Sequence, residues 1–172
     1  MSATEKGSEP RFEHSGEKTL VGKRKVMSLT EDKTFELWKC FMPASSKIEE
    51  KVGTLFYSIV VYPRDYFKNF NPHATFEKWA AVEVASRASI PVEMESIVIP
   101  EGPYAVFVHK GTASTGAGTF QYIFGTWLPA SDFLIDNRPH LAVMGESYGQ
   151  DDPDSEEEIW IPIKLKGNRE DI

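Results

Sequence analysis

Two segments of this sequence, half a chain apart, match each other in residue type. The matching pairs are Leu37 with Ile123, Trp38 with Phe124, Phe41 with Trp127, Met42 with Leu128 and Pro43 with Pro129. Their offset is 86 residues (129 − 43), half of the 172-residue chain. A self-match with a long period is typical of a duplicated structural unit. Two similar halves meet along a seam, where concave ligand sites tend to form, so the match bears on function as well as on fold.

The composition is that of one globular domain. The chain is 41% hydrophobic and 26% charged, and 172 residues suffice for a proper core. The net charge of −7 argues against non-specific binding to nucleic acid or to an anionic membrane, because both attract basic proteins. We therefore expect neither direct DNA binding nor membrane contact.

Features of targeting and redox state favour a cytoplasmic protein. No apolar run approaches the ~20 residues that cross a bilayer, and the first twenty residues lack the apolar core of a signal peptide. The single cysteine, Cys40, cannot form an internal disulfide, which fits a reducing compartment. Cys40 falls on a predicted apolar helix, so we expect it in the core.

The pattern of elements predicts one domain over residues 10–166, with a disordered tail at 1–9 and a second tail at 167–172. Each half predicts a strand–helix–strand–strand unit. The first has strands at 19–29, 55–62 and 76–85 and a helix at 30–42; the second has strands at 94–99, 104–109, 140–145 and 159–165 and a helix at 119–128. The residues Ser28 to Glu31 fit a capping box for the first helix. Without regular βαβ alternation, the class is α+β with a mostly antiparallel sheet.

Alternation along two strands separates a possible ligand face from a helix-bearing face. One side of residues 76–84 is largely aliphatic, whereas the other carries Trp79 and Glu83. The strand at 159–165 likewise opposes isoleucines to Trp160. We expect the aliphatic faces to carry the helices and the tryptophan face to bind a ligand, since pockets combine large aromatics with a few polar groups. The alternative is that these tryptophans pack under a loop at a sheet edge.

Several short motifs fail for lack of context. Residues 145–149 match G-x-S-x-G, but loop residues follow, and the last histidine, His140, precedes Ser147, so a serine hydrolase is not indicated. The glycine-rich run 111–118 lacks the lysine of a phosphate loop. The four histidines show no metal-ligand spacing, so we expect neither metal nor cofactor. The acidic run 151–158 is typical of a solvated loop that could meet a basic protein partner.

Six segments together resemble a known family. They are ELWKCFMP at 36–43, YSIVVYP at 57–63, FEKWAAVEV at 76–84, GPYAVFVHKG at 102–111, IFGTWLP at 123–129 and DPDSEEEIWIPI at 152–163. In order and spacing they resemble the GyrI-like small-molecule-binding domains, the effector-binding domains of AraC-type and multidrug-responsive transcription regulators. The resemblance covers roughly residues 10–164, nearly the whole chain.

The resemblance implies a duplicated unit with two main helices on one face of an antiparallel sheet and a ligand cleft on the other. It also implies binding of bulky aromatic or cationic compounds, since aromatic faces attract cations. Glu83 would be the electrostatic anchor. The candidate ligand-binding residues are Tyr57, Trp79, Glu83, Tyr104, Phe107, Trp127, Met144 and Trp160. Trp127 is equally suited to a core position, because it lies on the predicted helix.

Two departures from the family shape the expected function. Relatives often carry a glutamate at the position of Ala142, which weakens the case for a cationic ligand. The effector-like domain leaves no room for a helix-turn-helix, so we expect a stand-alone drug or toxin sensor or sequestrator, monomeric or homodimeric. One alternative is a hydrolase that opens cyclopropane rings of alkylating toxins, with Glu83 as its general base. Another is a gyrase-inhibitor-like interaction module that docks through residues 151–158.

Overall fold

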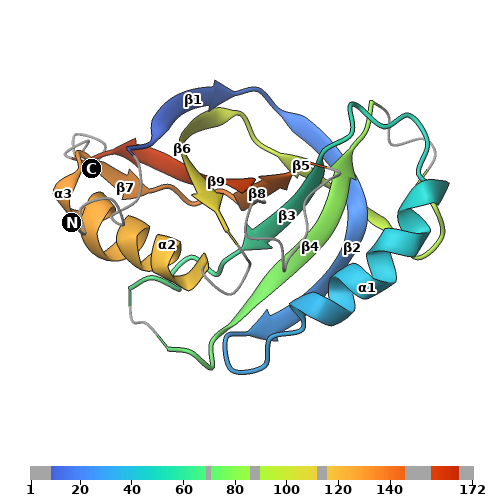
Figure 1. Cartoon of the computed structure of the whole chain (residues 1–172), viewed down its shortest axis with the longest axis horizontal. Helices are drawn as coiled ribbons and strands as arrows, with labels where there is room; N and C mark the ends of the chain where they lie inside the picture. The colour runs from blue at the N-terminus through green and yellow to red at the C-terminus, as the bar shows by residue number, and fades with distance from the viewer. Residues whose placement is uncertain (1–8, 69–70, 86–89, 112–115, 146–155, 167–172) are drawn as a thin grey trace.

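The protein is an α+β fold in which helices cover one face of a large antiparallel sheet, as predicted. The computed structural model describes residues 9–68, 71–85, 90–111, 116–145 and 156–166, so both expected tails lie almost wholly outside the described residues. The elements are β1 Arg11–Ser15, β2 Lys18–Ser28, α1 Thr34–Ala44, η2 Ser45–Lys47, β3 Phe56–Val61, β4 Thr75–Glu83, β5 Glu95–Ile99, β6 Gly102–Lys110, α2 Gly116–Tyr122, η4 Ile123–Trp127, α3 Leu128–Ala130, β7 Phe133–Ile135, β8 His140–Met144 and β9 Glu156–Leu165. Figure 1 shows α1 and α2 at the lower right and lower left, with curved strands between them.

The strand order shows two copies of one unit joined at a seam. It runs β1-β6-β9-β8-β3-β4-β2-β5, and β7 pairs with β9 off this path. The units β2-α1-β3-β4 and β6-α2-β8-β9 meet where β3 pairs antiparallel with β8. At the centre of this pairing Ser58 lies opposite Ala142. A pseudo-twofold axis passes between these two residues, which relates positions 84 residues apart (142 − 58).

The first strand of each half is exchanged between the halves. β1 precedes β2 but pairs with β6, and β5 precedes β6 but pairs with β2. Glu13 pairs with Tyr104, and Ile97 pairs with Leu20, so both partners in one pairing lie 84 residues from their counterparts in the other (97 − 13 and 104 − 20). The identical register confirms the duplication.

The helices bury the aliphatic sheet faces, as predicted. One cluster joins α1 to β4 through Leu37, Phe41, Phe76, Ala80 and Val82. A second cluster joins the helical segment 116–130 to β6 and β9 through Ala105, Phe107, Ile123, Ile159, Ile161 and Ile163. Burying several such side chains stabilises each helix by a few kcal/mol, at about 1.5–3 kcal/mol for each large side chain.

The opposite sheet face closes over a core of its own. Its buried cluster contains Leu20 and Ile99 from one end of the sheet and Tyr104 from the other, together with residues of the central strands. These strands lie far apart in the sheet order, so the sheet must curl around this face to bring them together. Strong twist and coiling are the normal means by which large sheets bring distant strands together.

Some boundaries differ from the sequence prediction for local reasons. Ser28 Oγ accepts a hydrogen bond from the Glu31 amide (3.0 Å), as in a capping box, but the segment forms a turn and α1 begins four residues later than predicted. There the Asp32 carboxylate accepts the Thr34 amide (2.9 Å). The second helix contains a π-helical turn, η4, before Pro129. Cys40 is exposed, contrary to the expected core position, because it lies on the solvent side of α1.

Gly22 permits the close approach of two strands and provides a test of the curl. A Cβ atom at Gly22 would overlap the Ala80 carbonyl oxygen and the Ala81 Cα on β4. We expect Gly22→Ala to lower the free energy of unfolding by about 3 kcal/mol, the upper range for overpacking, as measured by urea unfolding. Gly16→Ala is the matched control, because a Cβ there meets nothing within 4 Å. Equal losses in the two variants would contradict this role for Gly22.

A candidate small-molecule site between the two helices

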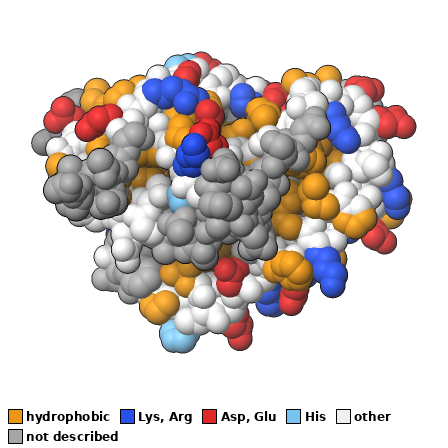
Figure 2. Space-filling view, viewed as in Figure 1, with side chains coloured by type: hydrophobic (Ala, Val, Ile, Leu, Met, Phe, Trp, Pro, Cys, Tyr) orange, Lys and Arg blue, Asp and Glu red, His pale blue; other side chains and the backbone are white. Residues whose placement is uncertain are grey.

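A cavity of about 550 Å³ lies over the seam between β3 and β8, with α1 and α2 as its walls. Its volume is in the range of small-molecule pockets. The lining residues are Thr34, Phe35, Trp38, Lys39 and Met42 of α1; Phe56, Ser58, Val60 and Tyr62 on and after β3; Lys78; Phe120; His140, Leu141, Ala142, Met144 and Gly145; and Glu157, Ile159 and Ile161. Figure 2 shows hydrophobic side chains beside α1 on the face viewed in Figure 1.

The cavity is on the helix-bearing face, not on the opposite face as the sequence led us to expect. The aliphatic strand residues do pack against the helices, but the helices diverge from the seam and leave space between them. The opposite face is filled by its own core because the sheet curls over it. Strand alternation distinguishes the two faces but does not show which one is closed.

The floor of the cavity is small at its centre and oppositely charged on its two sides. Ser58 and Ala142 lie beside the pseudo-twofold axis. On β4 and β9 equivalent positions differ by 79 residues, and Lys78 and Glu157 obey this offset (157 − 78). The two halves therefore place an ammonium group and a carboxylate at corresponding positions of one floor.

Lys78 is held by a short relay of hydrogen bonds. Its Nζ donates to Thr34 Oγ1 (3.0 Å), which donates to Asp32 Oδ1 (2.5 Å) at the start of α1. Burial lowers the pKa of Lys78, and the carboxylates of Asp32 and Glu157 offset part of this effect. The lowered pKa means that these carboxylates do not fully replace the water that the ammonium group lost.

His140 closes one end of the cavity within a cluster of aromatic rings. Its ring lies 4.8 Å from that of Tyr62 in an edge-on contact and stacks on that of Phe67 at 5.7 Å. Phe124 stacks on Phe67 (5.5 Å) and on Phe120 (6.2 Å), so the rings continue to the mouth of the cavity. Burial, with a further contribution from the Arg138 charge, lowers the pKa of His140 to about 3, so the imidazole is neutral at pH 7.

The mouth of the cavity is apolar and exposed. Phe35 is 68% exposed and Phe120 is 43% exposed, although both are large hydrophobic side chains. Deeper in the cavity, Trp38 makes edge-on contacts with Phe41 at 5.8 Å and with Phe56 at 6.4 Å. Exposed apolar surface around a cavity is typical of binding sites.

Of the eight candidate ligand-binding residues, Met144 lines this cavity and the other seven do not. Tyr57, Trp79, Tyr104 and Trp160 do come together, but in the core of the opposite face. Trp79 and Tyr104 are 4% and 0% exposed. Glu83 lies on that same face, where its charge, together with the larger effect of burial, raises the pKa of Tyr57 to about 12.

The two remaining candidates pack beneath the second helical segment. The rings of Phe107 and Trp127 meet edge-on at 5.1 Å. Trp127 also stacks on Phe133 at 6.3 Å. Of the two roles considered for Trp127, the structure therefore shows the core position.

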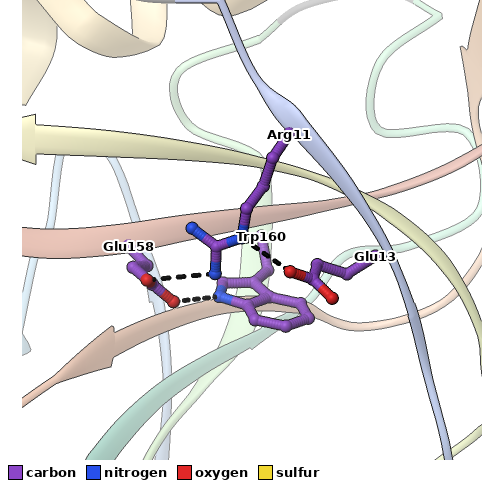
Figure 3. A network of polar contacts seen from close by, with 4 residues as sticks. All are labelled: Arg11, Glu13, Glu158 and Trp160. Carbon is purple, nitrogen blue, oxygen red and sulfur yellow. Dashed lines mark hydrogen bonds and ion pairs between the residues drawn. The ribbon is translucent and has the colours of Figure 1, made fainter.

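Trp160 takes part in a polar network that joins β1 to β9 across β6. Its Nε1 donates to Glu158 (3.1 Å), and Arg11 donates to both Glu158 (3.0 Å) and Glu13 (2.7 Å). Figure 3 shows the Arg11 guanidinium above the Trp160 ring, 5.9 Å from its centroid. The groups are partly exposed, so the ion pairs add little stability. The tryptophan indole is engaged by the protein itself.

Residues that the sequence analysis passed over form most of the cavity. Lys78 gave a usable signal, because it is a charge on the otherwise apolar side of β4. The acidic run was in part misassigned: Glu156 to Glu158 begin β9, and Glu157 lines the cavity, whereas residues 151–155 lie outside the described residues. The G-x-S-x-G motif likewise falls outside them after Gly145.

Two further searches concern the described residues alone. They contain no group of three or more His, Cys, Asp or Glu side chains arranged to hold a metal ion. Nor do they include a helix long and apolar enough to span a membrane.

A duplicated antiparallel sheet with two helices around a ring-lined cavity defines a small-molecule-binding domain. Residues 12–163 match the model of the Cass2 family, described as integron-associated effector binding protein. The chain belongs to this family, and its fold is that of a GyrI-like effector-binding domain.

Individual proteins show the same relationship. The chain is 30% identical over 151 residues to the transcriptional regulator BrlR of Pseudomonas aeruginosa, which covers 84% of this chain but only 52% of BrlR. It therefore spans about half the length of that relative. SAV2435 bound to tetraphenylphosphonium has a similar fold (TM-score 0.71, 14% identity, 91% of this chain and 94% of that one). So does the C-terminal domain of EcmrR (TM-score 0.65, 15% identity, 91% and 97%).

Stability should depend on pH through His140. The unfolded histidine has a pKa near ~6.5, whereas that of the folded one is about 3, so the stabilisation is complete above pH ~6.5 and is lost as the pH falls toward 3. The slope is at most ~1.4 kcal/mol per pH unit. We expect His140→Phe to flatten the fall in unfolding free energy between pH 7 and pH 5, measured by urea unfolding. His73→Gln, at an exposed histidine, is the control, and an unchanged slope in His140→Phe would contradict the assignment.

Proposed function

We propose that this protein binds a bulky, ring-bearing small molecule in the cavity between α1 and α2, as a sensor or sequestrator. The observation that carries this proposal is the cavity itself: about 550 Å³, walled by Trp38, Phe35 and Phe120, with a few polar groups on its floor. Aromatic walls with a small number of placed polar groups are the usual composition of ligand sites.

The family relationship supports the same function. The family is described by effector binding, and SAV2435 holds tetraphenylphosphonium, a bulky compound with aromatic rings. At 14% identity SAV2435 is evidence for the fold alone, so the ligand class of this protein must be argued from its own cavity.

Binding rather than turnover is the activity that we propose. The hydrolase alternative depended on Glu83 as a general base, and Glu83 is not among the residues that line the cavity. A general base must lie within hydrogen-bond reach of the proton that it removes. Glu83 is on the opposite face, in contact with a packed core and not with this space.

A neutral aromatic dye tests the proposal without involving charge. N-phenyl-1-naphthylamine should bind with a rise in its fluorescence, and Ala142→Trp should weaken it at least ~10-fold, about 1.4 kcal/mol, because an indole on the cavity floor occupies the space. Titration at fixed protein concentration gives the affinity. Leu165→Trp adds the same side chain at an exposed strand position and is the matched control. Absence of dye binding to the unmodified protein, or equal binding to both variants, would overturn the proposal.

A further inference from the structure

Lys78 is the polar group of the cavity that is best placed to contact a ligand. It lies on the floor, half-buried, on the side of the sheet that α1 covers. One of its N–H groups is used by Thr34 Oγ1 (3.0 Å). The other two find no hydrogen-bond partner among the described residues. Partly buried donors without partners are costly, and a ligand acceptor would remove that cost.

The charges that surround Lys78 leave it incompletely compensated. Asp32 is the nearer source of negative charge, but its carboxylate already accepts both the amide and the hydroxyl of Thr34. Burial outweighs the combined effect of Asp32 and Glu157 on the lysine, whose pKa is lowered. Lys39 lines the mouth of the same cavity, where its ammonium lies 5.9 Å from the Phe35 ring centroid.

The cavity also lacks a negative charge where one would favour a cation most. Ala142 occupies the centre of the floor, beside the pseudo-twofold axis, and supplies only a methyl group. His140 is neutral, with a pKa lowered to about 3 by burial. Among the described lining residues, the charged groups are therefore Lys39, Lys78 and the single carboxylate of Glu157.

We propose that the ligand is an aromatic compound with a carboxylate or similar anionic group, which lies at Lys78 while its rings fill the space between Trp38 and Phe120. This inference rests on the proposed function and specifies its ligand class. The anion accepts the two remaining N–H groups of Lys78, and the relay through Thr34 to Asp32 fixes the position of the ammonium. Charge-assisted hydrogen bonds of this kind are stronger than neutral ones.

Three naphthalenes that differ only in charge test the inference. 2-Naphthoate is anionic, 2-naphthalenemethanol is neutral and 2-naphthylmethylammonium is cationic. Each is titrated against protein carrying N-phenyl-1-naphthylamine, and its affinity is taken from displacement of the dye. We expect naphthoate to bind ~10- to 100-fold more tightly than the cation, with the neutral alcohol between them.

Variants at the two equivalent floor positions locate the effect. Lys78→Met should weaken naphthoate ~10- to 100-fold and leave naphthalenemethanol nearly unchanged, which also shows that the site remains folded. Glu157→Gln, at the pseudo-symmetric position, should not weaken naphthoate. Lys78→Arg keeps the charge and should retain most of the affinity for the anion. Lys164→Met, on the exposed end of β9, controls for the change in net charge.

The outcomes separate this inference from the proposed function. If the dye binds but the cation displaces it as well as naphthoate does, the ligand class is wrong and small-molecule binding stands. If Lys78→Met weakens all three compounds equally, Lys78 has a structural role and the inference is overturned. If neither the dye nor any naphthalene binds, the proposed function itself fails.

Discussion

The pairing of β3 with β8 is the interaction on which the rest of the structure depends. Five residue pairs join the two halves there, from Phe56 with Met144 to Val60 with His140. A slip of one residue would turn every side chain on these strands to the other face. The observed register directs Ser58 and Ala142 into the space between the helices, and their small size makes the floor of a cavity there.

The curl of the sheet decides which of its faces can bind. The exchange of β1 and β5 extends each half with a strand from the other, and the resulting long sheet bends around the cluster that contains Trp79 and Tyr104. A glycine at position 22 allows β2 to approach β4 closely enough for this bend. One face is thereby used up as core, and the helices on the other face remain far enough apart to leave a cavity.

The sequence predicted the repeated unit, the principal strands and the aliphatic helix faces, because these depend on local alternation and on the self-match. The site was not predictable in the same way. Trp79 and Trp160 are large aromatics on one sheet face, as expected for a pocket, but contacts between strands distant in sequence fill that face with protein. Lys78 was the available local signal, since a charge within an apolar face requires a partner or a function.

The two halves of the protein share a backbone but not a charge pattern. A perfectly symmetric cavity would bind an asymmetric ligand equally well in two orientations, because every contact would have a counterpart across the axis. Lys78 and Glu157 occupy corresponding positions and remove this equivalence. Their opposite charges distinguish the α1 side of the floor from the α2 side, so a ligand with one charged end gains a preferred orientation from the divergence of two duplicated strands.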